Sequence, residues 1–131
     1  MILVVDDDYA IRKLLEVKLR SEGYDVVTAE SGPEALDIAG KQRPDLIVLD
    51  NMMPGMSGER VAARVRATNG LQDVPILMLT AVRSDETVER AFAAGVDDYV
   101  TKPFNLSEIV WRVRALLRRT APAPRPPADG E

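Results

Sequence analysis

The chain has 131 residues, with 17 basic and 21 acidic side chains and a formal net charge of −4. This length suits one domain, and the charge gives no general reason to expect nucleic-acid binding. The sequence holds no cysteine and no histidine, which excludes disulfides, thiol chemistry, histidine-based catalysis and histidine metal sites. No apolar run approaches the roughly 20 residues of a membrane span. Because Met1 leads directly into an apolar segment, we expect a cytoplasmic protein without membrane contact.

Hydrophobic patterning predicts strands that alternate with helices along the whole chain. Apolar runs of strand length lie at 1–5, 25–29, 45–49, 75–79 and 97–101. Helical spacing, together with caps and glycine stop signals, predicts helices over 9–22, 31–40, 59–67, 85–94 and 105–119. In the first helix, the side chains expected to face the sheet are Ile11, Leu14, Leu15 and Leu19. This alternation favours an α/β fold with a doubly wound parallel sheet and helices on both faces.

Composition divides the chain into a domain at 1–119 and a proline-rich end at 120–131. The prolines of this end are Pro122, Pro124, Pro126 and Pro127. Such a segment is not helical, and we expect it to be an extended, flexible tail or a shortened linker.

Four of the five predicted strands end on polar residues that are able to share one site. Asp6 and Asp7 follow the first strand, Asp50 the third, Thr80 the fourth and Lys102 the fifth. In open α/β sheets, ligands bind outside the carboxyl ends of the strands. Three carboxylates are suited to a hard cation such as Mg²⁺, while Lys102 and Thr80 are suited to phosphoryl oxygens. Asp50, alone at its strand end, is the best candidate for a nucleophile that forms an aspartyl phosphate.

Four motifs lie at these strand ends, in order along the chain. They are VVDDD at 4–8, DNMMPGMSG at 50–58, TA at 80–81 and DDYVTKPF at 97–104. Together they resemble the receiver domain of bacterial two-component response regulators, and the resemblance covers residues 1–119. The ending VRALLRR at 113–119 is most similar to the receivers of winged-helix transcription regulators. The resemblance implies a flavodoxin-like sheet of strand order 2-1-3-4-5.

The resemblance also implies a chemical role for each matched residue. Asp50 would accept a phosphoryl group from a sensor histidine kinase. Asp7 would bind Mg²⁺ directly, Asp6 would act largely through water, and Met52 would lend its backbone carbonyl to the metal. Lys102 would pair with the phosphoryl oxygens.

The same resemblance implies a switch. Thr80 would move to bind the phosphoryl group, and Tyr99 would swing inward behind it. The face formed by the fourth helix, fifth strand and fifth helix would then change and control a partner or output domain. In the family, the bond between Lys102 and Pro103 is cis. The chain would catalyse only its own phosphoryl transfer and dephosphorylation.

Several residues also have simpler interpretations. A Mg²⁺-dependent phosphatase would carry a second acid two residues past its nucleophile, where this chain has Met52. Tyr99 alternates with apolar neighbours and could be plain strand packing. Asp97 and Asp98 are expected to be surface groups or partner contacts. Asp8 is expected to cap the first helix rather than to bind a metal.

The surface expected to carry the output gives mixed signals about self-association. Winged-helix receivers usually place a basic residue where this chain has Val88 and an acid where it has Ala93. Asp98 and Arg112 retain one expected cross-dimer pair, so we expect a monomer or a weak dimer on activation. Trp111 is either part of a partner surface or half-buried packing. No DNA-binding element is present, so we expect no direct nucleic-acid contact from what is either a stand-alone receiver or a fragment.

Overall fold

The computed structural model describes residues 1–81 and 84–120. Its elements are β1 (Ile2–Val5), α1 (Tyr9–Ser21), β2 (Val26–Ala29), α2 (Gly32–Lys41), β3 (Leu46–Asp50), α3 (Gly58–Arg66), β4 (Ile76–Thr80), α4 (Asp85–Ala93), β5 (Asp98–Thr101) and α5 (Leu106–Thr120). Each predicted element is present, with its ends within one residue of the prediction. Apart from Thr120, the predicted tail lies outside the described residues. Within 1–81 and 84–120, no helix is both long and apolar enough to cross a bilayer.

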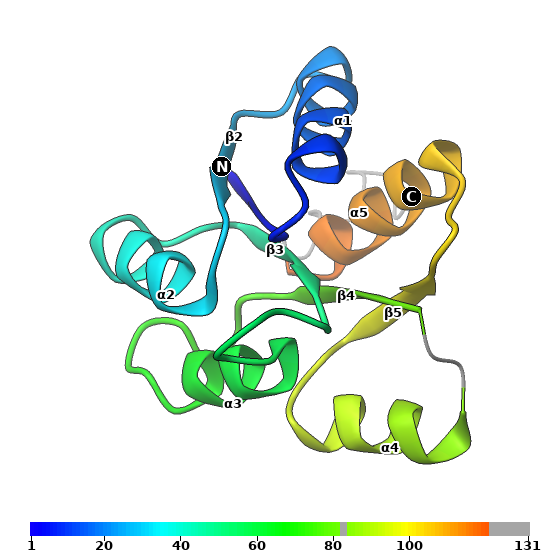
Figure 1. Cartoon of the computed structure of the whole chain (residues 1–131). Coiled ribbons are helices and arrows are strands. Elements are labelled where there is room, and N and C mark those ends of the chain that lie inside the picture. The colour runs from blue at the N-terminus through cyan, green and yellow to red at the C-terminus, as the bar shows by residue number, and fades with distance from the viewer. Residues whose placement is uncertain (82–83, 121–131) are drawn as a thin grey trace, which may run out of the picture.

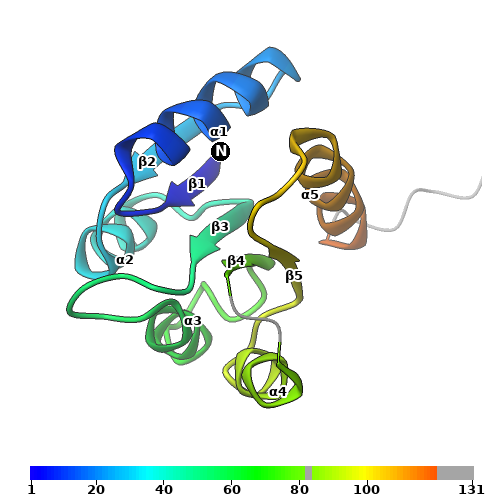
Figure 2. The same ribbon diagram turned by 45° about the vertical axis from the view of Figure 1, so that its right-hand side comes forward.

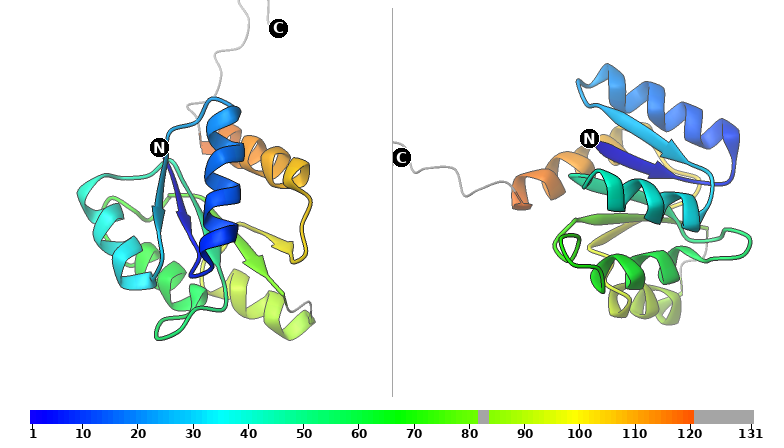
Figure 3. Two further views of the ribbon diagram at one scale, coloured as in Figure 1. Left: turned by 45° about the horizontal axis from the view of Figure 1, so that its top comes forward. Right: turned by 90° about the vertical axis from the view of Figure 1, so that its left-hand side faces the viewer.

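The strands form one parallel sheet in the order β2-β1-β3-β4-β5, as predicted (Figure 1). Its register aligns Val5 with Leu49, Asp50 with Leu79, and Thr80 with Thr101. Because the strands are parallel and end at matching levels, the residues that follow them gather at one edge. The right-hand panel of Figure 3 shows the loops after β1 and β3 projecting from this edge. We call it the carboxyl edge, and the opposite one the amino edge.

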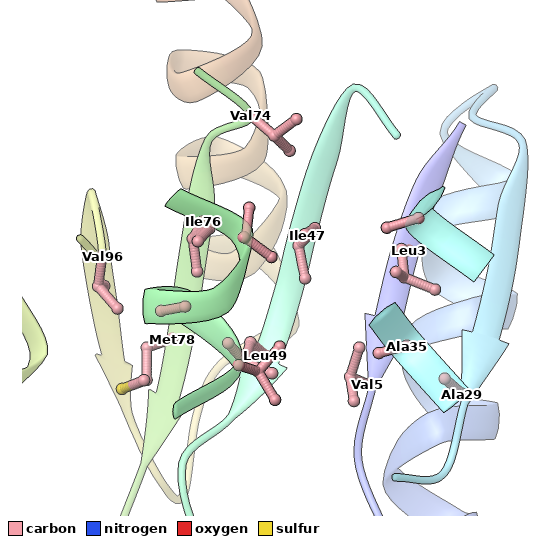
Figure 4. Close-up of a cluster of buried hydrophobic side chains, with 14 of the residues drawn as sticks. Leu3, Val5, Ala29, Ala35, Ile47, Leu49, Val74, Ile76, Met78 and Val96 are labelled. Atoms are coloured by element: carbon pink, nitrogen blue, oxygen red, sulfur yellow. The ribbon is translucent and has the colours of Figure 1, made fainter. Parts of the chain in front are cut away.

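Helices cover both faces of the sheet and create two separate apolar clusters. The helices α1 and α5 lie on one face, while α2, α3 and α4 lie on the other (Figures 1 and 2). Alternate strand residues point to opposite faces. Strand residues of the α2–α3–α4 cluster include Leu3, Val5, Ile47, Leu49, Ile76 and Met78 (Figure 4). Strand residues of the α1–α5 cluster include Ile2, Val4, Leu46, Val48, Leu77 and Leu79.

The helix α1 shows one error of the sequence-based prediction. Leu15 and Leu19 are fully buried and Ile11 packs beside them, but Leu14 is 48% exposed. Successive helical residues are about 100° apart, so the one before Leu15 is turned away from the stripe that Ile11, Leu15 and Leu19 form. Asp8 caps this helix, as predicted, by accepting hydrogen bonds from the backbone N–H groups of Ala10 and Ile11.

The helices α4 and α5 flank β5 on opposite faces, and they are anchored very differently. In α4 the buried residues are small, namely Thr87 and Ala91. In α5 the buried residues are larger, namely Ile109, Val110, Val113 and Leu116. The apolar contact that holds α4 to the sheet is therefore much smaller than the contact that holds α5.

Candidate functional site

Asp50 is the last residue of β3, a strand whose five residues are all buried. The Asp50 side chain is reached by two donors at the carboxyl edge. Lys102 Nζ lies 3.0 Å from its Oδ1, and the backbone N–H of Met52 donates to the same oxygen at 3.4 Å. Because β3 is a central strand that fixes its backbone, the carboxylate of Asp50 has a defined position at the carboxyl edge.

Asp6, Asp7 and Asp50 form an acidic cluster in which one carboxylate oxygen of each lies within 4.8 Å of the others. Asp6 is fully buried and Asp7 is exposed, so the cluster reaches from the interior to the surface. Lys102 Nζ also lies 3.5 Å from Asp6 Oδ2. The structure thus brings together the predicted carboxylates and the predicted ammonium group.

Burial is the largest single influence on the pKa of Asp50 and on the pKa of Lys102. Burial raises the pKa of Asp50, the hydrogen bond from Lys102 lowers it, and the charge of Asp6 raises it again, to about 6. Burial also lowers the pKa of Lys102, but its hydrogen bond and charge interaction with Asp50, and the charge of Asp6, raise it above its ordinary value. The cluster holds three carboxylates, and Lys102 pairs with two of them, so its negative groups outnumber this ammonium group.

An all-oxygen cluster with surplus negative charge suits a hard divalent cation such as Mg²⁺. Buried like charges at this separation are costly unless a cation offsets them. The side chain of Met52, two residues past Asp50, is 65% exposed and carries no acid–base group. This position therefore lacks the second acid that the phosphatase alternative requires.

The loop after Asp50 is held by contacts that the sequence did not reveal. The backbone N–H of Gly58 donates to the carbonyl of Asn51 at 3.0 Å. A Cβ atom at Gly58 would lie only 2.4 Å from the backbone oxygen of Asp50. Glycine is thus required for the first turn of α3 to pack on the end of β3. In the sequence, Gly58 is distinguished only as the last residue of the motif at 50–58.

Thr80 and Tyr99, the predicted switch residues, lie on the neighbouring strands β4 and β5. Thr80 is buried at the end of β4, and its carbonyl accepts the backbone N–H of Lys102 at 2.7 Å. The bond between Lys102 and Pro103 is cis, as the resemblance implied. A backbone hydrogen bond therefore joins the end of β4 to Lys102, the residue that carries the ammonium group of the site.

Tyr99 is partly buried and connects β5 with α4. Its ring meets the ring of Phe92 edge-on, with the centroids 6.0 Å apart. It also lines a surface pocket together with Ser84, Asp85 and Val88 of the α4 region. The two interpretations of Tyr99, as a packing residue and as a switch residue, are therefore compatible. Its ring packs on α4, the helix that a switch would move.

Asp97 and Asp98 lie partly at the surface and are also engaged within the chain. Asp97 Oδ2 accepts hydrogen bonds from Arg66 Nη2 and from the backbone N–H of Ile76, both at 2.8 Å. Its 27% exposed side chain therefore also connects elements of the fold, which the sequence did not indicate. Asp98 is held by Arg112, whose Nη1 lies 2.9 Å from Oδ2. Trp111, on the same helix as Arg112, is 66% exposed, which rules out the half-buried alternative.

A doubly wound parallel sheet with an acidic cluster at its carboxyl edge defines a flavodoxin-like α/β domain whose site suits a cation. The family model described as the response regulator receiver domain matches residues 2–114, and the chain belongs to this family. It is thus a signalling protein of the two-component type, whose receiver domains act as phosphorylation-dependent switches.

Similar proteins agree with this assignment. The response regulator MprA of Mycobacterium sp. strain KMS is 50% identical over 121 residues, which cover 92% of this chain and 52% of the relative. A protein of Mycobacterium tuberculosis strain H37Rv, named a probable transcriptional regulatory protein TcrX, is 46% identical over 119 residues, covering 91% and 50%. This chain therefore spans about half the length of these curated relatives.

Solved structures confirm the fold. The chemotaxis protein CheY4 of Vibrio cholerae superposes with a TM-score of 0.85 and 36% identity, covering 88% of this chain and 96% of that one. The receiver domain of the Francisella response regulator 1452 gives a TM-score of 0.85 and 36% identity, covering 91% and 97%.

Proposed function

We propose that Asp50 accepts a phosphoryl group from a histidine of a sensor kinase. A carboxylate oxygen of Asp50 attacks the phosphorus, the phosphorus–nitrogen bond breaks, and its electron pair leaves with the imidazole nitrogen. The observation that carries this proposal is the position of Asp50, buried at the end of β3 with Lys102 at 3.0 Å. With a pKa of about 6, Asp50 is largely ionised, and so nucleophilic, at neutral pH.

The surplus negative charge supports Mg²⁺ as the cofactor of this reaction. Asp7, Asp50 and the backbone carbonyl of Met52 would hold the ion, and Asp6 would act through water. When bound, Mg²⁺ supplies positive charge that offsets the phosphoryl oxygens. Lys102 pairs with a phosphoryl oxygen from the other side, which requires it to leave part of its present contact with Asp50.

The phosphoryl group on Asp50 would change the face formed by α4, β5 and α5. Thr80 would bind a phosphoryl oxygen, and Tyr99 would move inward with the α4 region that it contacts. The small buried surface of α4 supports this direction of movement. The changed face would control a downstream protein or an output domain, and the name of TcrX is compatible with transcription as the output.

We propose residues 1–119 as the receiver unit and 120–131 as the tail or linker toward an output domain. The receiver would work beside its kinase in the cytoplasm, without direct nucleic-acid or membrane contact. Because Arg112 is already paired with Asp98 in the same chain, a cross-dimer pair between these residues gains little. A monomer, or a weak dimer on activation, follows.

Phosphorylation with a small donor tests the proposal. We expect acetyl phosphate and Mg²⁺ to add the mass of one phosphoryl group to the protein, and Asp50→Asn to abolish the addition. The matched control is Asp45→Asn, which changes an aspartate directly before the same strand and should label normally. Full labelling of the Asp50→Asn variant would place the acceptor elsewhere.

The exposed side chain of Trp111 reports on the output face. Beryllofluoride with Mg²⁺, a mimic of the phosphoryl group, is expected to change its fluorescence, and Thr80→Ala should reduce the change while metal binding survives. Sedimentation of the same samples checks self-association. A tight dimer at one micromolar would contradict the weak association, for which we expect a Kd of tens of micromolar or above, on the order of 6 kcal/mol.

A further inference from the structure

Arg12 reaches back from α1 to the backbone of the acidic cluster. Its Nη1 donates to the backbone carbonyl of Asp6 at 2.8 Å. The side chain is only 14% exposed, and Nη2 lies 3.7 Å from Glu30 Oε2 in the loop after β2. The guanidinium carbon also lies 5.6 Å from the centroid of the Tyr9 ring. Three neighbours therefore fix this side chain, and no sequence pattern distinguishes it from other helical arginines.

The carbonyl that Arg12 holds belongs to the peptide bond between Asp6 and Asp7. The neighbouring groups are also fixed, since the N–H of Asp6 donates to Ala29 O at 3.1 Å and the N–H of Asp8 donates to Asp6 Oδ1 at 2.9 Å. Asp7, by contrast, is exposed. The direction in which the Asp7 carboxylate leaves the backbone thus depends on a peptide plane that Arg12 orients.

Two physical effects of Arg12 on a bound cation have opposite signs. As a nearby positive charge, it repels a divalent ion, so its removal should strengthen binding. As an orienting group, it places a ligand correctly, so its removal should weaken binding, most of all for an ion with strict geometry. Mg²⁺ demands near-ideal octahedral coordination, whereas Ca²⁺ accepts flexible geometry.

We propose that Arg12 is a positioning residue that favours Mg²⁺ over Ca²⁺ by fixing the peptide between Asp6 and Asp7. This inference rests on the proposed function, because it presumes that the acidic cluster binds Mg²⁺. Glu30 has a supporting part, since it holds the guanidinium from the next loop.

Metal titration of Arg12→Met tests the proposal. We expect the affinity for Mg²⁺ to fall about tenfold, the lower end of the loss typical when a group that orients a metal ligand is removed. The affinity for Ca²⁺ should fall by less than about twofold, because its coordination adapts. Calorimetric titration of the full chain with each ion measures both. Arg12→Lys, which keeps a donor and the charge, should recover part of the preference for Mg²⁺.

Arg20→Met is the matched control. Arg20 lies on the same helix and also donates to a backbone carbonyl, that of Val26 at 2.8 Å, but near the opposite end of the helix. Its removal changes the net charge equally and should leave the ratio of Mg²⁺ to Ca²⁺ affinity unchanged. Urea unfolding of each variant without metal shows whether it is folded, and Arg12→Lys carries the test should Arg12→Met not fold.

The outcomes separate this inference from the proposed function. If the wild type binds no Mg²⁺, or binds it equally after Asp7→Ala, then the proposed metal site is wrong and the role of Arg12 falls with it. If the wild type binds through Asp7 but Arg12→Met binds Mg²⁺ equally or more tightly, only the positioning role is overturned. An equal loss for both ions also overturns it, because geometry would then not be the cause.

Discussion

The two edges of the sheet both hold clusters of partly buried charges, but they differ in balance. At the amino edge, Arg66 donates to the carbonyls of Gly95, Gln72 and Val74 and to the carboxylate of Asp97. That carboxylate also accepts the N–H of Ile76. One cation and one anion thus satisfy each other and the backbone around them.

At the carboxyl edge, Lys102 pairs with two carboxylates, those of Asp6 and Asp50, and the carboxylate of Asp7 lies close to both. Burying charge is costly, and the cost is offset only when opposite charge and hydrogen bonds are supplied. The amino edge supplies both from within the chain, so its charges serve the fold. The carboxyl edge leaves a surplus that a cation would complete. An excess of carboxylates, rather than buried charge itself, thus distinguishes the edge at which we propose the site.

The largest effect is expected from breaking the balanced edge. Arg66→Met would leave several carbonyls and the carboxylate of Asp97 without their donor, and should lower the free energy of unfolding by about 3 kcal/mol. Urea denaturation measures this loss. Arg64→Met, an exposed position on the same helix, should stay within about 0.5 kcal/mol. If Arg66→Met cost no more than this control, the amino edge would not be a structural tie.

At the carboxyl edge, removal of a charge is expected to stabilise the protein. Asp50→Asn removes a buried negative charge and, without Mg²⁺ at pH 7, should raise the free energy of unfolding by about 2 kcal/mol. The pKa of Asp50 is raised from 3.8 to about 6 in the folded protein, so folding favours its protonated form. The stability it contributes is present below pH 4 and is lost as the pH rises toward 6.

The control is the pH dependence of the difference in unfolding free energy between Asp50→Asn and the wild type. The advantage of Asp50→Asn over the wild type should be absent near pH 4 and fully developed above pH 6, because only the wild type loses the proton. Thermal or urea unfolding of both proteins across this range measures it. An advantage that was constant with pH would show that the charge of Asp50 is not the cause.

The smallest expected effect on stability comes from adding Mg²⁺, whose positive charge would offset the carboxylates of the carboxyl edge. Mg²⁺ at ten times its Kd should raise the free energy of unfolding of the wild type by about 1.4 kcal/mol. At the same concentration, Asp7→Ala with tenfold weaker binding should gain only about 0.4 kcal/mol. Arg66→Met should gain as much as the wild type, because its defect lies at the other edge. A smaller gain in Arg66→Met would show that the two edges are coupled.

Sequence patterns predicted the fold because the spacing of apolar residues indicates which side chains are buried when the chain folds. Asp50 and Lys102 were predictable for the same reason, since a polar residue that ends an apolar strand must lie at the sheet edge. Contacts made across loops were not predictable. Arg12 donates to the backbone carbonyl of Asp6, and Gly58 packs against the backbone carbonyl of Asp50. Neither an arginine nor a glycine indicates by its residue type which backbone group it contacts. The contact between Asp97 and Arg66 was not predictable either, because the two residues are 31 positions apart in sequence.

Because α4 and α5 bury different amounts of apolar surface, the proposed output face combines one weakly anchored helix, α4, with one firmly anchored helix, α5. With only small side chains buried, α4 can shift at little energetic cost, whereas α5 holds four larger apolar residues in the core. The two helices share β5 but rest on separate clusters, so one can move while the other stays in place. If the proposed switch operates, the surface at α4 and β5 should change most, and a partner that touched α5 alone should meet the smaller change. We therefore expect a partner that senses the state of the site to contact α4 as well as α5.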